Sequence, residues 1–186
     1  EQLAPTQPFP TRPAPYDMQG LTEDDLIDFS PELRQLAIEA LADFEIGPLF
    51  QPPLHRDNDL GKRASLWCPA DVGGTNIDGT PAFDPETGII YIPSQKGCGS
   101  RVMIPGADKD PGGLYEDQTV QPTGTTITDF VPGGSASPGR IDGLPYWKAP
   151  YSKITAIDLN TGDHLWWIPI GDTPGYVLEH PALQGK

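Results

Sequence analysis

The chain has 186 residues, in which 26 acidic side chains stand against 12 lysines and arginines, so the formal net charge is −14. This acidic balance argues against binding to nucleic acid or to an anionic membrane surface, because both require basic counter-surfaces. The hydrophobic content of 37% suffices for a core of single-domain size, which argues against wholesale disorder. The 23 prolines and 21 glycines indicate many short elements rather than long helices.

Targeting and redox signals are sparse. No apolar run approaches the roughly 18 residues that span a bilayer, and the first residues lack the basic and apolar regions of a signal peptide. We therefore expect a soluble chain or a processed one. Cys68 and Cys98 permit one disulfide, which suits an oxidising compartment, and two free thiols are an equal alternative.

The first segment, residues 1–21, is rich in proline and predicts an extended arm, because each proline fixes its own φ and biases the preceding residue toward extended geometry. Phe9 and Tyr16 make the arm more adhesive than a pure spacer. We expect it to lie along a larger body.

The second segment, residues 22–63, carries the helical signal. Thr22 and the acidic residues after it predict a capped helical turn. Ser30 followed by Pro31 predicts the start of a helix, and Gly47-Pro48 predicts its end. Between them lies one apolar stripe at helical spacing, formed by Leu33, Leu36, Ala37, Ala40, Leu41 and Phe44.

The third segment, residues 64–186, changes to short β-type runs separated by turn-forming residues. The clearest strands are predicted at 89–92, 154–157 and 165–168, where β-branched and aromatic residues gather. A long insertion at about 96–145 interrupts them, with short strands predicted only at 125–127 and 130–131. Loops of this length in compact folds usually serve function or pack on a neighbour.

An internal repeat defines the architecture of this segment. Residues 82–88 recur as residues 156–162, an offset of 74, and both copies place an Asp at the end of a strand and close a turn on Thr-Gly. The Asp carboxylate can accept from turn N–H groups and the Gly supplies a positive φ, so each copy predicts a β-hairpin. Such hairpins form the outer parts of propeller blades, and the offset fits one blade with a large insertion or nearly two blades.

The segment from Ala156 to Trp166 resembles the tryptophan-docking motif of the quinoprotein dehydrogenases, Ala-x-Asp-x-x-Thr-Gly-Asp/Glu-x-x-Trp. Residues 72–76 with 82–94, residues 143–151 and the N-terminal arm and helix are similar to the same family. The resemblance implies an all-β fold that is part of an eight-bladed β-propeller, with an N-terminal extended arm and one covering α-helix. It also implies that Trp166 docks one blade on the next.

In that family pyrroloquinoline quinone lies at the centre of the wheel with a Ca²⁺ or lanthanide ion. The resemblance implies that Gly74, Thr75 and Asn76 bind the cofactor, with the Asn76 amide donating to a quinone oxygen. Ile77 stands where relatives carry Trp. The alternative is that Asn76 only caps a Gly-rich turn.

Other candidate sites are weaker. The resemblance implies that the catalytic Asp and the metal ligands lie on other segments, so neither Asp71 nor Asp78 is assigned a metal. His55, His164 and His180 show no triad order and no zinc spacing, and surface or turn roles are expected.

The implied function is part of an oxidoreductase that oxidises an alcohol, sugar or polyol hydroxyl by hydride transfer to the quinone, with electrons passing to a quinone or cytochrome acceptor. The resemblance places such enzymes in the periplasm, either soluble or membrane-associated through other segments. Eight blades at roughly 40–45 residues each exceed 186 residues, so companion polypeptide segments are expected to complete the ring. The alternative is a non-catalytic periplasmic scaffold or binding protein.

Overall fold

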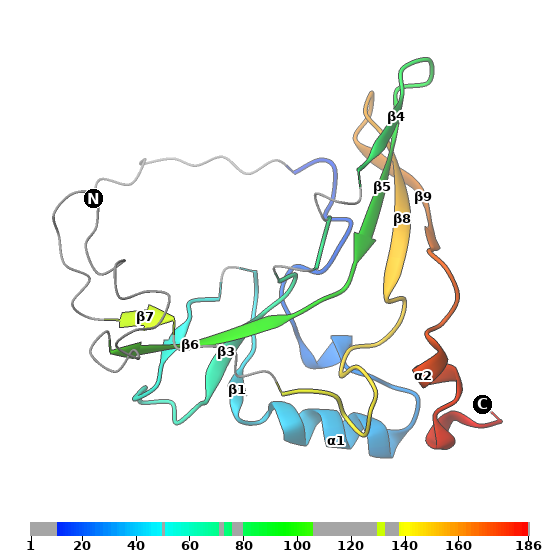
Figure 1. Cartoon of the computed structure of the whole chain (residues 1–186). Helices are drawn as coiled ribbons and strands as arrows, with labels where there is room; N and C mark the ends of the chain where they lie inside the picture. Colours follow the sequence, from blue (N-terminus) through cyan, green and yellow to red (C-terminus); the bar gives the residue numbers. More distant parts are fainter. Residues whose placement is uncertain are drawn as a thin grey trace, which may run out of the picture.

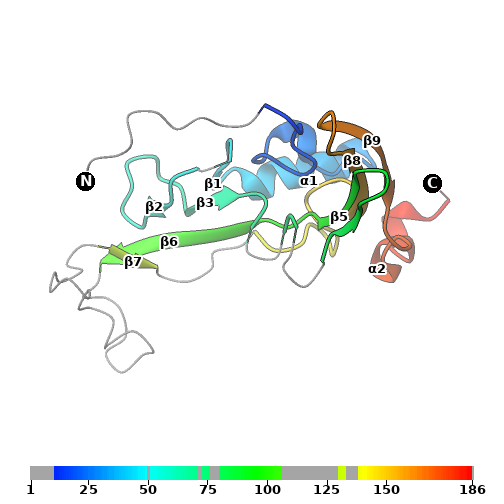
Figure 2. The same cartoon turned by 90° about the horizontal axis from the view of Figure 1, so that it is seen from above.

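The computed structural model describes residues 11–49, 51–70, 73–75, 80–105, 130–132 and 138–185. Over these ranges the chain forms mostly strands, arranged in two sheets, with few helices (Figures 1 and 2). The predicted predominance of β-structure is therefore confirmed, although the sheets of the described part do not close into a ring. Within the same ranges no helix has the length and apolar character needed to cross a bilayer.

The first sheet has four antiparallel strands in the order β4-β5-β8-β9. It stands upright at the upper right of Figure 1. The strands are β4 (Ala82–Asp84), β5 (Ile89–Gln95), β8 (Ser152–Asp158) and β9 (Asp163–Pro169). The three runs predicted at 89–92, 154–157 and 165–168 are confirmed as strands, because they lie within β5, β8 and β9.

The two copies of the repeat lie in this one sheet, so of the two explanations of their offset, one unit with a large insertion applies and nearly two units does not. β5 pairs with β8 along seven residue pairs, from Ile89 opposite Asp158 to Gln95 opposite Ser152. The hairpins β4–β5 and β8–β9 are therefore the two halves of a single sheet, and the offset of the repeat arises from the insertion between β5 and β8. The pairing of β5 with β8 places both hairpins in one sheet, and the local sequence pattern does not encode that pairing.

The hairpin turns themselves follow the prediction. The side chain of Asp84 accepts from the N–H of Glu86 at 2.9 Å and from the Thr87 hydroxyl at 2.7 Å, and these bonds, the Thr87 one first, hold the pKa of Asp84 below its ordinary value. Asp158 accepts from the N–H of Asn160 at 2.8 Å. The glycine that closes each turn has a positive φ near 75°, which costs glycine little.

The second sheet follows the order β1-β3-β6-β2, and β7 pairs with β6. Its strands are β1 (Phe44–Glu45), β2 (Leu54–His55), β3 (Ala64–Trp67), β6 (Gly99–Pro105) and β7 (Phe130–Pro132). β7 confirms the strand predicted at 130–131, whereas residues 125–127 lie outside the described residues. β6 was not predicted, because its sequence lacks alternation and the strand depends on its antiparallel pairing with β3.

The helix α1 (Pro31–Leu41) begins as predicted. Ser30 is the N-cap, its hydroxyl accepts from the N–H of Leu33 at 3.3 Å, and Pro31 occupies the first helical position. Before it, Glu23–Asp25 form the predicted short turn as a 3₁₀ helix. Leu33, Ala37 and Leu41 are buried, while Leu36 of the same predicted stripe is 44% exposed.

The end of α1 differs from the prediction, since the helix stops at Leu41 and does not continue to Gly47-Pro48. Phe44, assigned to the apolar stripe, instead starts β1 and pairs with Ala64 of β3 in a parallel ladder. The guanidinium of Arg63 lies 5.4 Å from the centre of the Phe44 ring. Strand pairing and ring packing thus outweigh the helical periodicity at this point.

The main core lies between α1, the segment before it, β3 and residues 141–146, below the four-stranded sheet in Figure 1. Its buried members are Met18, Leu21, Leu26, Ile27, Leu33, Ala37, Leu41, Phe44, Ala64, Leu66, Cys68, Ile141, Leu144, Tyr146 and Val177. Val177 comes from the short helix α2 (Gly175–Leu178), which precedes a 3₁₀ helix at Pro181–Leu183. Burial raises the pKa of Tyr146.

Gly20 joins the N-terminal arm to this core at a point that admits no side chain. Its φ is 109°, and a Cβ atom there would lie 2.3 Å from the carbonyl oxygen of Gly47 and 2.7 Å from the backbone of Pro48. Its N–H donates to the carbonyl of Cys68 at 2.8 Å. The arm therefore enters the core through a backbone-to-backbone contact.

We expect Gly20→Ala to lower the free energy of unfolding by at least about 2 kcal/mol, because an unfavourable φ is combined with a backbone clash. Gly61→Ala is the matched control, since Gly61 has a φ of 65° and no atom within 4 Å of the added Cβ. Urea unfolding of both variants measures the difference. Equal losses for the two would contradict the clash at Gly20.

Candidate functional site

The loop of residues 73–75 extends the four-stranded sheet at one edge, beside the end of β5. Gly74 forms an isolated antiparallel bridge with Gln95, with N–H···O distances of 2.7 and 3.0 Å. Because Gln95 already pairs with Ser152 of β8 on its other side, Gly74 lies on the edge where β4 pairs with β5. The loop and β9 therefore lie at opposite edges of the sheet.

A disulfide and close glycine packing fix the base of this loop. Cys68 and Cys98 are bonded, with their Cα atoms 4.5 Å apart, which resolves the alternative between a bridge and two free thiols. The N–H of Ala70 donates to Gly97 at 2.9 Å. A Cβ atom on Gly73 would lie 2.6 Å from the carbonyl oxygen of Gly97, so the contact with the 97–98 backbone requires a glycine there.

Thr75 is held from the N-terminal arm. Its hydroxyl donates to the phenol oxygen of Tyr16 at 2.7 Å in a part-buried setting. The two residues are 59 positions apart in the chain. The hydrogen bond therefore joins the loop to the N-terminal arm.

The structure brings together two of the three residues predicted to bind the cofactor. Gly74 and Thr75 are consecutive in the loop, and both are anchored by hydrogen bonds. Asn76, the third, lies outside the described residues, as do Asp71 and Asp78.

The sequence did not single out Lys96, which flanks the loop. Its ammonium group donates to the carbonyl of Lys148 at 2.8 Å, and its backbone N–H donates to Tyr151 at 2.8 Å. Burial lowers the pKa of Lys96 below its ordinary value, and the carboxylates of Asp25 and Asp17 act in the opposite direction. Lys96 directly precedes Gly97, whose backbone contacts Gly73 of the loop. This position is the sequence signal that could have related Lys96 to the loop.

The described residues offer no group of three or more His, Cys, Asp or Glu side chains that could hold a metal ion. The histidines contact turns and the backbone of distant segments. His55 Nδ1 accepts from the N–H of Asp57 at 3.1 Å, and His180 Nδ1 accepts from the N–H of Ala182 at 3.3 Å. His164 Nε2 lies 2.8 Å from the carbonyl oxygen of Ala14.

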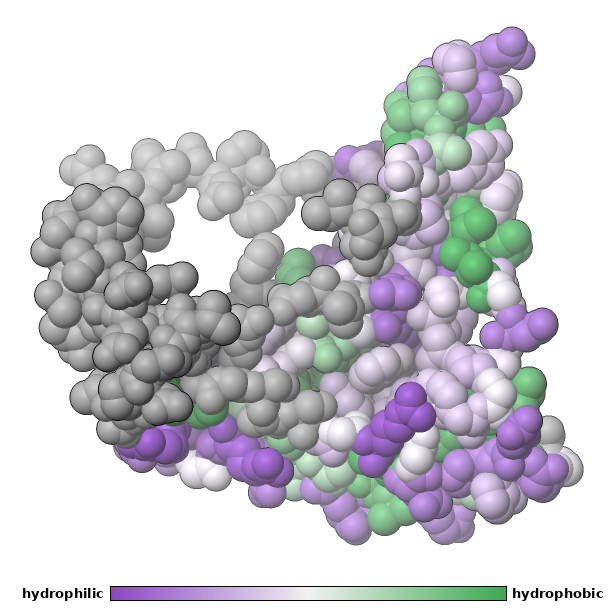
Figure 3. All heavy atoms as spheres, viewed as in Figure 1, coloured by the Kyte–Doolittle hydropathy of each residue, from purple (hydrophilic) through white to green (hydrophobic). Residues whose placement is uncertain are grey.

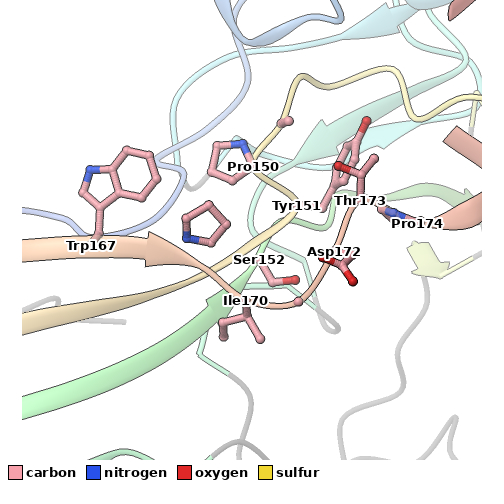
Figure 4. Close-up of a pocket in the computed structure, with 11 residues that line it drawn as sticks. Pro150, Tyr151, Ser152, Trp167, Ile170, Asp172, Thr173 and Pro174 are labelled. Atoms are coloured by element: carbon pink, nitrogen blue, oxygen red, sulfur yellow. The ribbon is translucent and has the colours of Figure 1, made fainter. Parts of the chain in front are cut away.

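A separate hollow of about 400 Å³ lies at the β9 edge. In Figure 4, Trp167 stands at one side of this hollow and Tyr151 with Thr173 at the other. Burial raises the pKa of Tyr151, with a smaller contribution from Tyr176. Because this hollow and Gly74 lie at opposite edges of the sheet, it is distinct from the predicted cofactor loop.

Comparison with known proteins gives two findings. The family described as "PQQ: Glucose/ethanol/alcohol dehydrogenase, beta-propeller domain" matches residues 1–184. The chain is also similar to a protein named "Probable quinate dehydrogenase (quinone)" from Xanthomonas campestris pv. juglandis, with 26% identity over 176 residues. That match covers 92% of this chain and 21% of the relative, so the chain spans about a fifth of the relative's length.

Replacing both cysteines, Cys68→Ala with Cys98→Ala, is expected to cost about 3 kcal/mol of unfolding free energy, because the bridge closes a loop of about 30 residues. We also expect the amide of Gly74 to exchange hydrogen faster, since the disulfide supports its bridge to Gln95. Urea unfolding and hydrogen exchange measure the two effects.

Reductant provides the control for this prediction. It should weaken the wild-type protein and leave the double variant unchanged. Unaltered exchange at Gly74 in the double variant would show that the disulfide does not support the loop.

Proposed function

The chain belongs to the pyrroloquinoline quinone family of glucose, ethanol and alcohol dehydrogenase β-propellers, and from this premise we propose that it is part of a quinoprotein oxidoreductase. The reaction that we propose is oxidation of an alcohol, sugar or polyol hydroxyl, with electrons passing to a quinone or cytochrome acceptor. The family match across 184 residues carries the proposal. The name of the quinate dehydrogenase (quinone) relative supports a small hydroxylated substrate and a quinone acceptor.

The residues that we propose to hold the quinone are Gly74, Thr75 and Asn76. The described part of the loop supports this assignment, because Gly74 carries no side chain and the Thr75 hydroxyl is held in place by Tyr16. A quinone held by these residues would supply the hydride acceptor for oxidation of the substrate carbon. The chain's own contribution is to hold the loop backbone at the sheet edge through Gln95 and to offer hydrogen-bond donors there.

Among the residues that the structure describes, no cluster of three or more His, Cys, Asp or Glu side chains could hold a metal ion. We propose that a Ca²⁺ or lanthanide ion and the catalytic Asp are contributed by other segments. We also propose a periplasmic location, soluble or membrane-associated through other segments. The division of the chain into an arm (1–21), a helical segment (22–63) and a propeller segment (64–186) is retained as part of the same proposal.

The exposed apolar side chains of the four-stranded sheet support its proposed place as one blade of a propeller, for which the family resemblance implies eight blades. Hydrophobic side chains gather over this sheet in Figure 3. Trp166 and Trp167 lie on opposite faces of β9. The centres of the Trp166 and Tyr91 rings are 5.7 Å apart, and the Lys153 ammonium lies 5.8 Å from the centre of the Trp167 ring. Both tryptophans are about half exposed. Apolar groups on both faces suit a sheet that packs between two neighbours.

In the proposed ring this sheet is one blade. The Gly74 edge faces the hub, β9 lies at the rim, and Trp166 docks on the next blade. The arm runs along the blade, and α1 is the covering helix. Companion polypeptide segments supply the remaining blades.

If companion segments complete the ring, mass spectrometry of the denatured active protein is expected to show polypeptide beyond the 20.1 kDa of this chain. The additional mass can appear as separate species or within one longer polypeptide. A species of 20.1 kDa as the sole polypeptide in an active sample would contradict the proposal.

The decisive experiment for the activity is reconstitution of the full-length apo-protein with pyrroloquinoline quinone and Ca²⁺. We expect uptake of the quinone chromophore and reduction of an artificial electron-accepting dye that depends on an added alcohol, aldose or quinate. The control omits the quinone. A protein that forms its ring but takes up no quinone would instead support the non-catalytic scaffold.

Asn76→Ala is expected to weaken quinone retention about tenfold, because a hydrogen-bond donor to the buried ring is lost. Asn160→Ala is the matched control, since Asn160 lies in the β8–β9 turn, where its side chain contacts Thr87 and Asp158. Equilibrium titration of the two apo-proteins compares the affinities. An unchanged quinone affinity in Asn76→Ala would remove Asn76 from the site and leave it the role of capping a turn.

A further inference from the structure

In the residues that precede Tyr16, the N-terminal arm is held by contacts with the β8–β9 hairpin. Arg12 lies 3.2 Å from the carboxylate of Asp163 and donates to the carbonyl of Thr161 at 3.2 Å. The carbonyl of Ala14 lies 2.8 Å from the ring of His164. These contacts are exposed and individually weak, but together they set the path of the arm before it reaches Tyr16.

The arm is fixed more firmly after Tyr16. Met18 is buried in the main core, and Gly20 donates its N–H to the carbonyl of Cys68 at 2.8 Å. Cys68 belongs to the disulfide at the base of the loop. Tyr16 is therefore held between two anchored points, and its backbone position relative to the loop is set by the fold.

The loop presents Thr75 to Tyr16 from an equally fixed backbone. Gly73 donates its N–H to Ala70 at 2.7 Å, and Gly74 exchanges two hydrogen bonds with Gln95. Thr75 comes next, and its side chain makes the bond to Tyr16. The hydrogen bond between the two hydroxyls thus joins the arm to Thr75 of the loop.

We propose that Tyr16 is a positioning residue for the quinone-binding loop. This inference rests on the proposed function. Tyr16 acts through Thr75: its phenol oxygen accepts from the Thr75 hydroxyl, which fixes Thr75 in the loop. A loop without this restraint would lose conformational entropy when the quinone binds. The hydrogen bond between Thr75 and Tyr16 orders the loop beforehand and so lowers this entropic cost of binding.

The test is a double-mutant cycle in the full-length apo-enzyme with Tyr16→Phe and Thr75→Val, which keep the side-chain shapes and remove the hydrogen bond. The readout is the dissociation constant for pyrroloquinoline quinone, measured by quenching of tryptophan fluorescence. We expect Tyr16→Phe to raise it about fivefold, as fits the loss of one part-buried hydrogen bond. The double variant should bind no more weakly than Thr75→Val alone, because both changes remove the same bond.

Tyr176→Phe is the matched control, since it removes a phenol hydroxyl from a residue of α2 whose ring lies 4.0 Å from the Arg140 guanidinium. Its quinone affinity should stay within twofold of wild type. Hydrogen exchange without quinone gives a second readout, and the amide of Thr75 should exchange faster in Tyr16→Phe and not in Tyr176→Phe.

The outcomes separate the two proposals. Wild-type protein that binds quinone while Tyr16→Phe binds it equally well overturns the positioning role alone. Additive losses in the double variant also overturn it, because they would show that Tyr16 and Thr75 act independently. Wild-type protein that takes up no quinone overturns the proposed function together with this inference.

Discussion

The pairing of β5 with β8 is the interaction on which the rest of the structure depends. It runs without interruption from Ile89 opposite Asp158 to Gln95 opposite Ser152, and it joins two hairpins that are separated by more than fifty residues of chain. Closing so long a connection has an entropic cost that grows only slowly with length, and seven cross-strand pairs offset it. The β5–β8 ladder also separates the predicted cofactor loop from β9, because it leaves Gly74 at one edge of the sheet and β9 at the other.

The distribution of buried surface supports the proposal that this sheet packs within a larger assembly. The main core is built by α1, the segments around it and β3, whereas β9 leaves its apolar side chains largely exposed. A sheet with two apolar faces needs a partner on each of them. The chain matches only 21% of the relative's length, which is consistent with partners that are supplied by other parts of the protein.

The candidate site shows what a local motif can and cannot indicate. The Gly-Gly-Thr-Asn run marked Gly74 and Thr75, because its similarity to a family pattern is contained in a few consecutive residues. The contribution of Tyr16 is absent from that pattern, since the hydroxyl pair spans 59 positions and the arm around Tyr16 shows only proline spacing. Lys96 was missed for the same reason, as its hydrogen bonds run to residues 148 and 151, which are distant in the chain.

The sequence by itself determined the features that arise from neighbouring residues: the Ser30 cap of α1, the Asp and Gly of the hairpin turns, and the predominance of short strands. These depend on φ preferences and on hydrogen bonds within a few residues, and both can be read from local order. The tertiary structure alone decided that α1 stops before Phe44, that β6 is a strand, and that both hairpins share one sheet. In each case a partner distant in the chain supplies the hydrogen bonds and apolar contacts, and their free energy exceeds the small local preferences.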